Sequence, residues 1–166
     1  MSVLLRNVVP ADVDAYVRLR CDPAMTADVG GPRRPEDMPA KVARDIADAV
    51  AGGAWNLMIL PEDSRPDIVA GTVTVYSHEH DGQARSEIGW MVLPEFQGRG
   101  LAQQAVALVL QRAKDERRWG LVHAFTDVGN VASNALCRSL RFDLQGLESH
   151  EFSGRIYTVN HWTVGA

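Results

Sequence analysis

Two glycines at the junction between an apolar stretch and a long helical segment are the clearest chemical signal in the sequence. The apolar stretch from Ser86 to Leu93 predicts a strand that stops at Pro94, and Gly98 and Gly100 follow just before a helix expected to begin at Leu101. Glycine permits a tight turn and a close backbone approach to a ligand. The first N–H groups of a helix lack intrahelical partners and carry the positive end of its dipole. The junction therefore predicts a binding site for a phosphate or diphosphate.

Two common phosphate-binding motifs are excluded by the spacing. A dinucleotide fingerprint needs a third glycine where Gln103 stands, and a P-loop needs a Gly-Lys-Ser/Thr run that the chain lacks. Arg99, between the two glycines, adds a positive charge where an anion would bind. A plain strand–helix turn without a ligand is the alternative.

Around this junction the chain alternates strands and helices in an order that indicates a mixed sheet with helices on both faces. A Pro- and Gly-rich loop from Cys21 to Pro39 either covers a site or is a solvated connector. The polar stretch from Ser77 to Gln83 is expected to be a hairpin connection that exposes His78 and His80. The expected strands are Val3–Val8, Trp55–Leu60, Ile68–Tyr76, Ser86–Leu93, Leu121–Thr126, Leu144–Phe152 and Arg155–Val164, and the helices are Pro10–Arg20, Glu36–Val50, Leu101–Arg118 and Ser133–Leu140.

Length and composition indicate one globular domain over residues 1–166, with 46% hydrophobic and 23% charged residues. The net charge of −4 argues against a nucleic-acid partner held by bulk phosphate attraction. Cys21 and Cys137 have no metal-ligand spacing and are expected to be reduced thiols. No stretch approaches the roughly 20 apolar residues of a membrane span. We therefore expect a cytoplasmic protein without a metal, a nucleic-acid partner or a membrane partner.

The segment from Pro94 to Ala102 resembles the Gln/Arg-x-x-Gly-x-Gly/Ala signature of the GNAT superfamily of N-acetyltransferases. The segments Asn130–Ser133 and Leu136–Phe142 resemble that family's downstream motif. The resemblance implies an α/β (α+β) fold, with a mostly antiparallel central sheet flanked by helices. It also implies that the strands Ser86–Leu93 and Leu121–Thr126 splay apart to hold acetyl-CoA. Asp22-Pro23 and Glu87-Ile88-Gly89-Trp90 are similar to the ribosomal-protein N-terminal acetyltransferase branch.

The same resemblance assigns cofactor-binding residues. Acetyl-CoA's pantetheine arm would bond to the backbone of Trp90, Met91 and Val92. Asn130 would bind the cofactor through its amide and Ser133 would assist, although both residue types are also good helix N-caps. The diphosphate would lie on the backbone amides of Gln97, Gly98, Arg99, Gly100, Leu101 and Ala102.

The implied reaction is direct attack of a neutral amine on the thioester, which requires a base for the amine proton. Glu87 is the first candidate, a solvent-facing carboxylate is the alternative, and His123 and Asp127 are further candidates. Cys137 stands where many members have a tyrosine that protonates the leaving thiolate. It is either that donor or a core residue. Acceptor-lining candidates, each of which could equally be core, are Trp55, Tyr76, Tyr157, His161 and Trp162.

The predicted function is therefore acetyl-CoA-dependent N-acetylation of a primary amine, on a protein N-terminus or a small molecule. The alternative is a catalytically silent acyl-CoA-binding or sensor domain. A homodimer through the terminal strands stays open.

Overall fold

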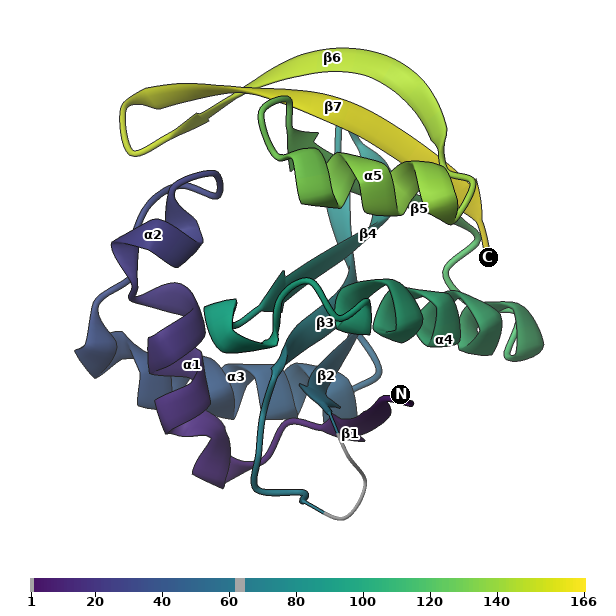
Figure 1. Cartoon of the computed structure of the whole chain (residues 1–166). Helices are drawn as coiled ribbons and strands as arrows, with labels where there is room; N and C mark the ends of the chain where they lie inside the picture. The colour runs from purple at the N-terminus through teal and green to yellow at the C-terminus, as the bar shows by residue number, and fades with distance from the viewer. Residues whose placement is uncertain (1, 62–64) are drawn as a thin grey trace.

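A computed structural model describes residues 2–61 and 65–166 of the chain. In these residues seven strands form one sheet in the order β1-β2-β3-β4-β5-β7-β6, and every neighbouring pair is antiparallel except β4 and β5 (Figure 1). The strands are β1 (Leu4–Asn7), β2 (Ala54–Leu60), β3 (Gly71–His80), β4 (Gln83–Val92), β5 (Leu121–Asp127), β6 (Asp143–Phe152) and β7 (Arg155–Gly165), and the helices are α1 (Val13–Arg20), α2 (Pro23–Thr26), α3 (Met38–Val50), α4 (Leu101–Asp115) and α5 (Val131–Ser139). The expected fold class is confirmed.

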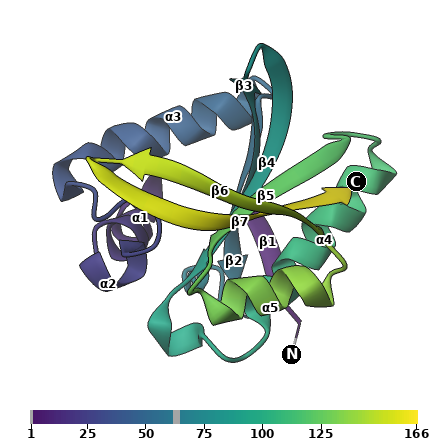
Figure 2. The same cartoon turned by 90° about the horizontal axis from the view of Figure 1, so that it is seen from above.

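Helices cover both faces of the sheet, as Figures 1 and 2 show. The larger core cluster joins α4 and α5 to one face, with Val106, Leu136 and Ile88 among its members. A smaller cluster joins α1 and α3 to the other face through Tyr16 and Met58. Side chains alternate along a strand, so Ile88 faces α4 whereas its neighbour Glu87 faces the side of α1 and α3.

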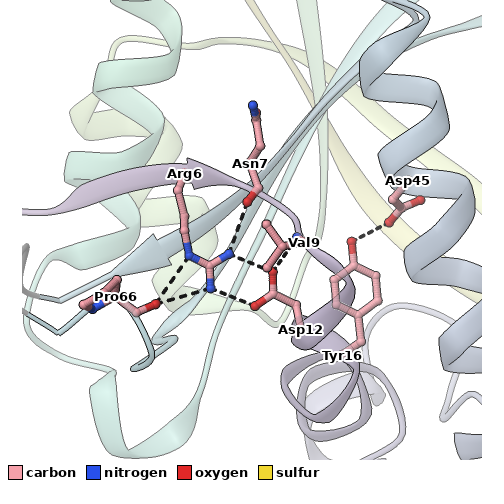
Figure 3. Close-up of polar contacts among 7 residues, drawn as sticks. All are labelled: Arg6, Asn7, Val9, Asp12, Tyr16, Asp45 and Pro66. Carbon is pink, nitrogen blue, oxygen red and sulfur yellow. Dashed lines mark hydrogen bonds and ion pairs between the residues drawn. The ribbon is translucent and has the colours of Figure 1, made fainter.

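Polar contacts fix the first helices to the sheet (Figure 3). The Arg6 guanidinium on β1 donates two hydrogen bonds to the Asp12 carboxylate, at 2.7 and 2.8 Å. The Tyr16 hydroxyl on α1 donates to the buried Asp45 carboxylate on α3 at 2.6 Å. These contacts hold α1 and α3 as one unit beside the sheet.

Three sequence-based boundaries were wrong. The predicted hairpin connection Ser77–Gln83 is mostly strand, because β3 and β4 pair as far as His80 and Gln83 around a turn at Asp81 and Gly82. The predicted loop Cys21–Pro39 contains α2 and a short 3₁₀ turn at Pro35–Asp37. The helix predicted to reach Arg118 ends at Asp115, and Arg117 has a left-handed backbone conformation. No helix in the described residues is long and apolar enough to cross a membrane.

Candidate active site

The two central strands separate in the middle of the sheet. β4 and β5 are paired at Ser86–Val122 and Glu87–His123. Beyond these pairs β4 continues to Val92 and β5 to Asp127, with no further pairing between them in the described chain. The predicted splay is confirmed, and it leaves one edge of β4 without a strand partner from Ile88 onward.

The ladder between β3 and β4 determines which backbone groups face this gap. The Leu93 N–H donates to the Ala70 carbonyl at 2.8 Å. Because backbone groups alternate in direction along an antiparallel strand, those of Met91 point toward β3 and those of Trp90 and Val92 point toward the gap. Of the three predicted backbone partners, Trp90 therefore presents both its N–H and its C=O to an extended ligand. Val92 presents its N–H, because its carbonyl accepts a hydrogen bond from the Gln97 side chain.

Gln97 stabilises the turn that follows β4. Its backbone N–H donates to the Pro94 carbonyl at 3.2 Å, and its side-chain amide donates to the Val92 carbonyl at 2.9 Å. Gln97 therefore connects the end of β4 to the turn. Its backbone N–H already has an acceptor in the protein.

Gly98 and Gly100 form a left-handed turn, each with φ near +73°. A Cβ at Gly98 would meet no atom within 4 Å, and one at Gly100 would meet the end of Gln104 at 3.7 Å. Either Cβ would therefore occupy open space at the mouth of the turn. In the described residues the N–H groups of Gly98, Arg99 and Gly100 donate to no backbone carbonyl. The turn can thus bring several N–H donors to an anion.

The start of α4 completes this donor set. Its N-cap, Gly100, has no side-chain cap, and its first turn holds no acidic residue. The unpartnered amides of Leu101 and Ala102 and the helix dipole therefore both favour an anion. Arg99 is exposed, with its guanidinium donating to the Glu95 carbonyl at 2.9 Å beside the Phe96 ring. These donors and this charge suit an anion, and the binding of a diphosphate here stays a prediction.

Asn130 caps α5, as one of the two sequence interpretations holds. Its side-chain oxygen accepts the Ser133 N–H at 3.0 Å. This cap uses the carbonyl oxygen of Asn130 and leaves the donors of its amide nitrogen for a ligand.

Asn134 is a structural residue that the sequence analysis missed. Its side-chain oxygen accepts from Thr126 at 2.6 Å and from Asn160 at 2.8 Å, and its nitrogen donates to the carbonyls of Asp127 and Asn130. It is 3% exposed. The signal in the sequence was an asparagine on the face of α5 that otherwise carries buried apolar residues, because a buried polar side chain needs hydrogen-bond partners. Asn134 holds the start of α5 against the separated end of β5.

Cys137 lies in the larger core cluster and is 0% exposed. Burial raises the pKa of its thiol to about 12, although the neighbouring Arg138 charge opposes the shift. The thiol is thus a weaker proton donor than an exposed cysteine.

Glu87 lies on the other face of the sheet from Cys137 and has polar neighbours. Its carboxylate is 2.9 Å from Nε2 of His78. Glu87 also lies directly opposite Tyr76 in the ladder between β3 and β4. Burial and the Glu87 carboxylate raise the pKa of the Tyr76 hydroxyl. The Glu87 side chain is 23% exposed, so it is sheltered yet accessible. His78, expected in an exposed loop, instead orients this carboxylate.

The family comparison matches most of the chain. The acetyltransferase (GNAT) domain family matches residues 2–143. This chain belongs to the GNAT acetyltransferase family. A comparison with curated proteins found no match.

Solved GNAT structures share its fold at low sequence identity. RimL, a ribosomal alpha-N-protein acetyltransferase in complex with coenzyme A, superposes with a TM-score of 0.83 at 21% identity, covering 99% of this chain and 94% of that one. The putative acetyltransferase yncA from Salmonella typhimurium, with acetyl-CoA, gives 0.78 at 20% identity, covering 99% and 94%. RimJ from Mycobacterium smegmatis, with CoA-disulfide, gives 0.80 at 21% identity, covering 99% and 82%.

On the Glu87 face, this GNAT domain carries a second polar cluster across β5, β7 and β6. Nδ1 of His123 lies 2.7 Å from Nε2 of His161, and Nδ1 of His161 lies 3.0 Å from the Glu148 carboxylate. Burial lowers the pKa of both histidines, and the Arg85 charge acts in the same direction. Since Glu87 pairs with His123 across the sheet, this cluster adjoins the Glu87 carboxylate.

The aromatic residues considered for acceptor lining divide between the two faces. Trp55 and Trp162 are 5% and 3% exposed in the core beside α4 and α5, so they do not line the Glu87 face. Tyr76 and His161 lie on that face. The loop after α2 meets the β6–β7 hairpin on the same side, because a Cβ at Gly30 would lie 3.2 Å from the Phe152 ring.

Proposed function

We propose that this protein is an acetyl-CoA-dependent N-acetyltransferase that acetylates a primary amine by direct attack on the thioester. The observation that carries the proposal is the separation of β4 from β5 beyond Glu87, next to the uncapped glycine turn at Gly98 and Gly100. The gap offers backbone partners for an extended arm, and the turn offers amide donors for a diphosphate. Acetyl-CoA has both parts.

The compared structures support the same cosubstrate. RimL and RimJ were solved with forms of coenzyme A, and yncA with acetyl-CoA. In this chain the pantetheine arm would pair with Trp90 and Val92, and Asn130 and Ser133 would lie at the far side of the gap. The backbone groups of Met91 point toward β3, so Met91 is not proposed to pair with the arm.

Glu87 is the proposed base. The amine nitrogen attacks the thioester carbon, its proton passes to the Glu87 carboxylate directly or through one water, and the C–S bond then breaks. His78 orients the carboxylate by its 2.9 Å contact. The Val92 N–H, directed into the gap, is the proposed donor to the tetrahedral oxyanion.

Cys137 and the solvent are the two candidate proton sources for the departing CoA thiolate. RimL's coenzyme A is joined to one of that protein's cysteines by a disulfide, which favours a cysteine near the CoA sulfur here. The buried thiol of Cys137, with a pKa of about 12, favours departure as the thiolate instead. Substitution of Cys137 separates these routes.

The acceptor is proposed to be a protein N-terminus or a small-molecule amine. RimL's name as a ribosomal alpha-N-protein acetyltransferase supports the first class. The polar side chains on the Glu87 face of the sheet could accommodate an acceptor of either class.

A thiol-release assay with an amine panel tests the proposal. The panel contains peptides with free N-termini, free amino acids, polyamines and aminoglycosides, and N-acetylated peptides serve as blocked controls. We expect amine-dependent release of coenzyme A with at least one acceptor and an acetylated product by mass spectrometry. Tight acetyl-CoA binding without turnover on any amine would instead support a silent acyl-CoA-binding domain.

A further inference from the structure

A cavity lies beside Tyr76, away from the glycine turn. Its volume is about 490 Å³, between the end of α1, the middle of α3 and strands β2 and β3. This size suits a small ligand such as an amino acid or a short peptide end. The residues of its lining that matter here are Arg20, Lys41, Asp45, Asp48, Asn56 and Tyr76.

Most of the buried polar groups in this lining satisfy one another. The Asp45 carboxylate accepts from the Tyr16 hydroxyl and pairs with the Lys41 ammonium. The Asn56 side-chain amide donates to the Asp45 backbone carbonyl at 2.9 Å. Asp48 is exposed at the rim. The charge of Lys41 is therefore already matched within the protein.

Arg20 is the exception. Its Nε is fully buried and has no hydrogen-bond partner, and its guanidinium makes no ion pair with any described carboxylate. The guanidinium carbon lies 5.1 Å from the Tyr16 ring centroid, so the ring supports one side of the group. Because Nε has no accessible surface, a ligand in the cavity would meet the two terminal nitrogens of the guanidinium, which can hold a carboxylate in two parallel hydrogen bonds.

We propose that this cavity binds a carboxylate of the acceptor through Arg20, so that the preferred acceptors are amines that also carry a carboxylate. Tyr76 connects the two sites, because it lines the cavity and pairs with Glu87 across β3 and β4. A ligand held by Arg20 at one end extends past Tyr76 and presents its amine to Glu87. The inference rests on the proposed acetyl transfer for its amine, but the carboxylate contact can be measured without turnover.

The test uses matched pairs of probes that differ in one group. The dipeptides methionylglycine, phenylalanylglycine and glutamylglycine, whose amine and terminal carboxylate lie at opposite ends, are compared with their C-terminal carboxamides by titration calorimetry, with the full chain saturated with coenzyme A. We expect at least one acid to bind about tenfold or more tightly than its amide, the scale of a charge-assisted pair. Arg20→Gln should reduce that ratio to about twofold or less.

Two controls separate a local effect from a folding or charge effect. Arg44→Gln removes an exposed charge from the neighbouring helix α3 and should leave the acid-to-amide ratio unchanged. Coenzyme A affinity and Tm of Arg20→Gln report whether the fold survives. If the unaltered protein does not distinguish acid from amide, or if the preference persists in Arg20→Gln, the inference is overturned.

Turnover assays on the same pairs separate the inference from the proposed function. Acid-selective binding without acetylation would support the carboxylate site and contradict acetyl transfer. Acetylation of acids and amides at equal kcat/KM would support transfer and contradict the carboxylate site.

Discussion

Glu87 and His123 are the last paired residues between β4 and β5, and the strands separate immediately beyond them. The carboxylate proposed as the base therefore stands at the closed end of the gap proposed to hold the pantetheine arm. Its side chain faces α1 and α3, whereas α4 and α5 cover the opposite face. In the proposed reaction an acceptor would approach from the side of α1 and α3, and acetyl-CoA would lie along β4.

Substitution of Gly100 by glutamate should abolish coenzyme A binding. The new side chain would occupy the mouth of the turn, add a negative charge and strain a residue at φ +73°. Gly82→Glu is the matched control, because Gly82 has φ +76°, open surroundings and a place in the β3–β4 turn. Calorimetry should detect saturable binding to the control alone. Equal affinity of both variants for coenzyme A would contradict a diphosphate site at the turn.

Glu87→Gln should lower kcat by about 100-fold or more, the usual scale for loss of a general base. Coenzyme A affinity should not change, because the side chain faces away from the turn. Glu79→Gln removes an exposed carboxylate from the adjacent strand and should retain activity. Initial rates across pH 6–9 provide the measurement, and full activity of Glu87→Gln over that range would exclude Glu87 as the base.

Cys137→Ala is expected to act mainly on stability. Loss of a fully buried side chain from the core should lower the free energy of unfolding by roughly 1 kcal/mol. Because the thiol's pKa of about 12 makes it a poor donor to a thiolate, kcat should stay within about twofold. Denaturant melts and a pH–rate profile measure the two effects. A large fall in kcat with unchanged stability would establish Cys137 as the proton donor.

Asn134→Ala should destabilise the protein by roughly 1–3 kcal/mol, because it leaves several buried polar groups without partners. Asn160→Ala removes a single donor to the same oxygen and should cost less. Urea unfolding of both variants gives the comparison. A smaller loss for Asn134→Ala than for Asn160→Ala would mean that the network does not anchor α5.

Acidification should destabilise the fold through His123 and His161. Burial lowers the pKa of both in the folded state, so the unfolded chain binds protons first as the pH falls through about 6.5. Their contribution to stability is complete above that value and is lost below it, by at most about 1.4 kcal/mol per pH unit for each proton. Protonation of both rings also removes the acceptor of their 2.7 Å contact.

Urea midpoints at pH 7.5 and 5.5 measure this loss. His123→Gln should reduce the difference between the two midpoints, whereas His80→Gln, in the exposed turn region, should not. Arg85, Glu148, His150 and His78 face the cluster and are kept unchanged. Equal pH dependence in all three proteins would contradict the assignment.

Local signals were sufficient for the central part of the fold. Pro94, the paired glycines and the helical segment after them determine a strand–turn–helix unit largely by near-neighbour physics, and the structure contains it. The β3–β4 extension was missed although Asp81-Gly82 is a two-residue hairpin signal, and both residues adopt positive φ. The polar composition of Ser77–Gln83 favours a loop, but the turn at Asp81-Gly82 and the pairing of the two strands outweigh it.

Long-range contacts account for most of the rest. The pairing of His78 with Glu87, the network of Asn134 and the unpartnered Nε of Arg20 each depend on which segments the sheet brings together. The sequence does not say on which face of the sheet Trp55 and Trp162 lie, because the register of their strands decides it. The backbone groups of Met91 likewise point toward β3, whereas those of Trp90 and Val92 point toward the gap. Residue type does not predict this difference.

Titration of coenzyme A into the folded protein tests the central claim most directly, with pantetheine, which lacks the diphosphate, as the matched ligand. A diphosphate held by the amides of Gly98 to Ala102 predicts saturable binding of one coenzyme A per chain and at least tenfold weaker binding of pantetheine, by the approximate scale of charge-assisted hydrogen bonds. Equal affinities for the two ligands, or no heat with coenzyme A, would contradict the account.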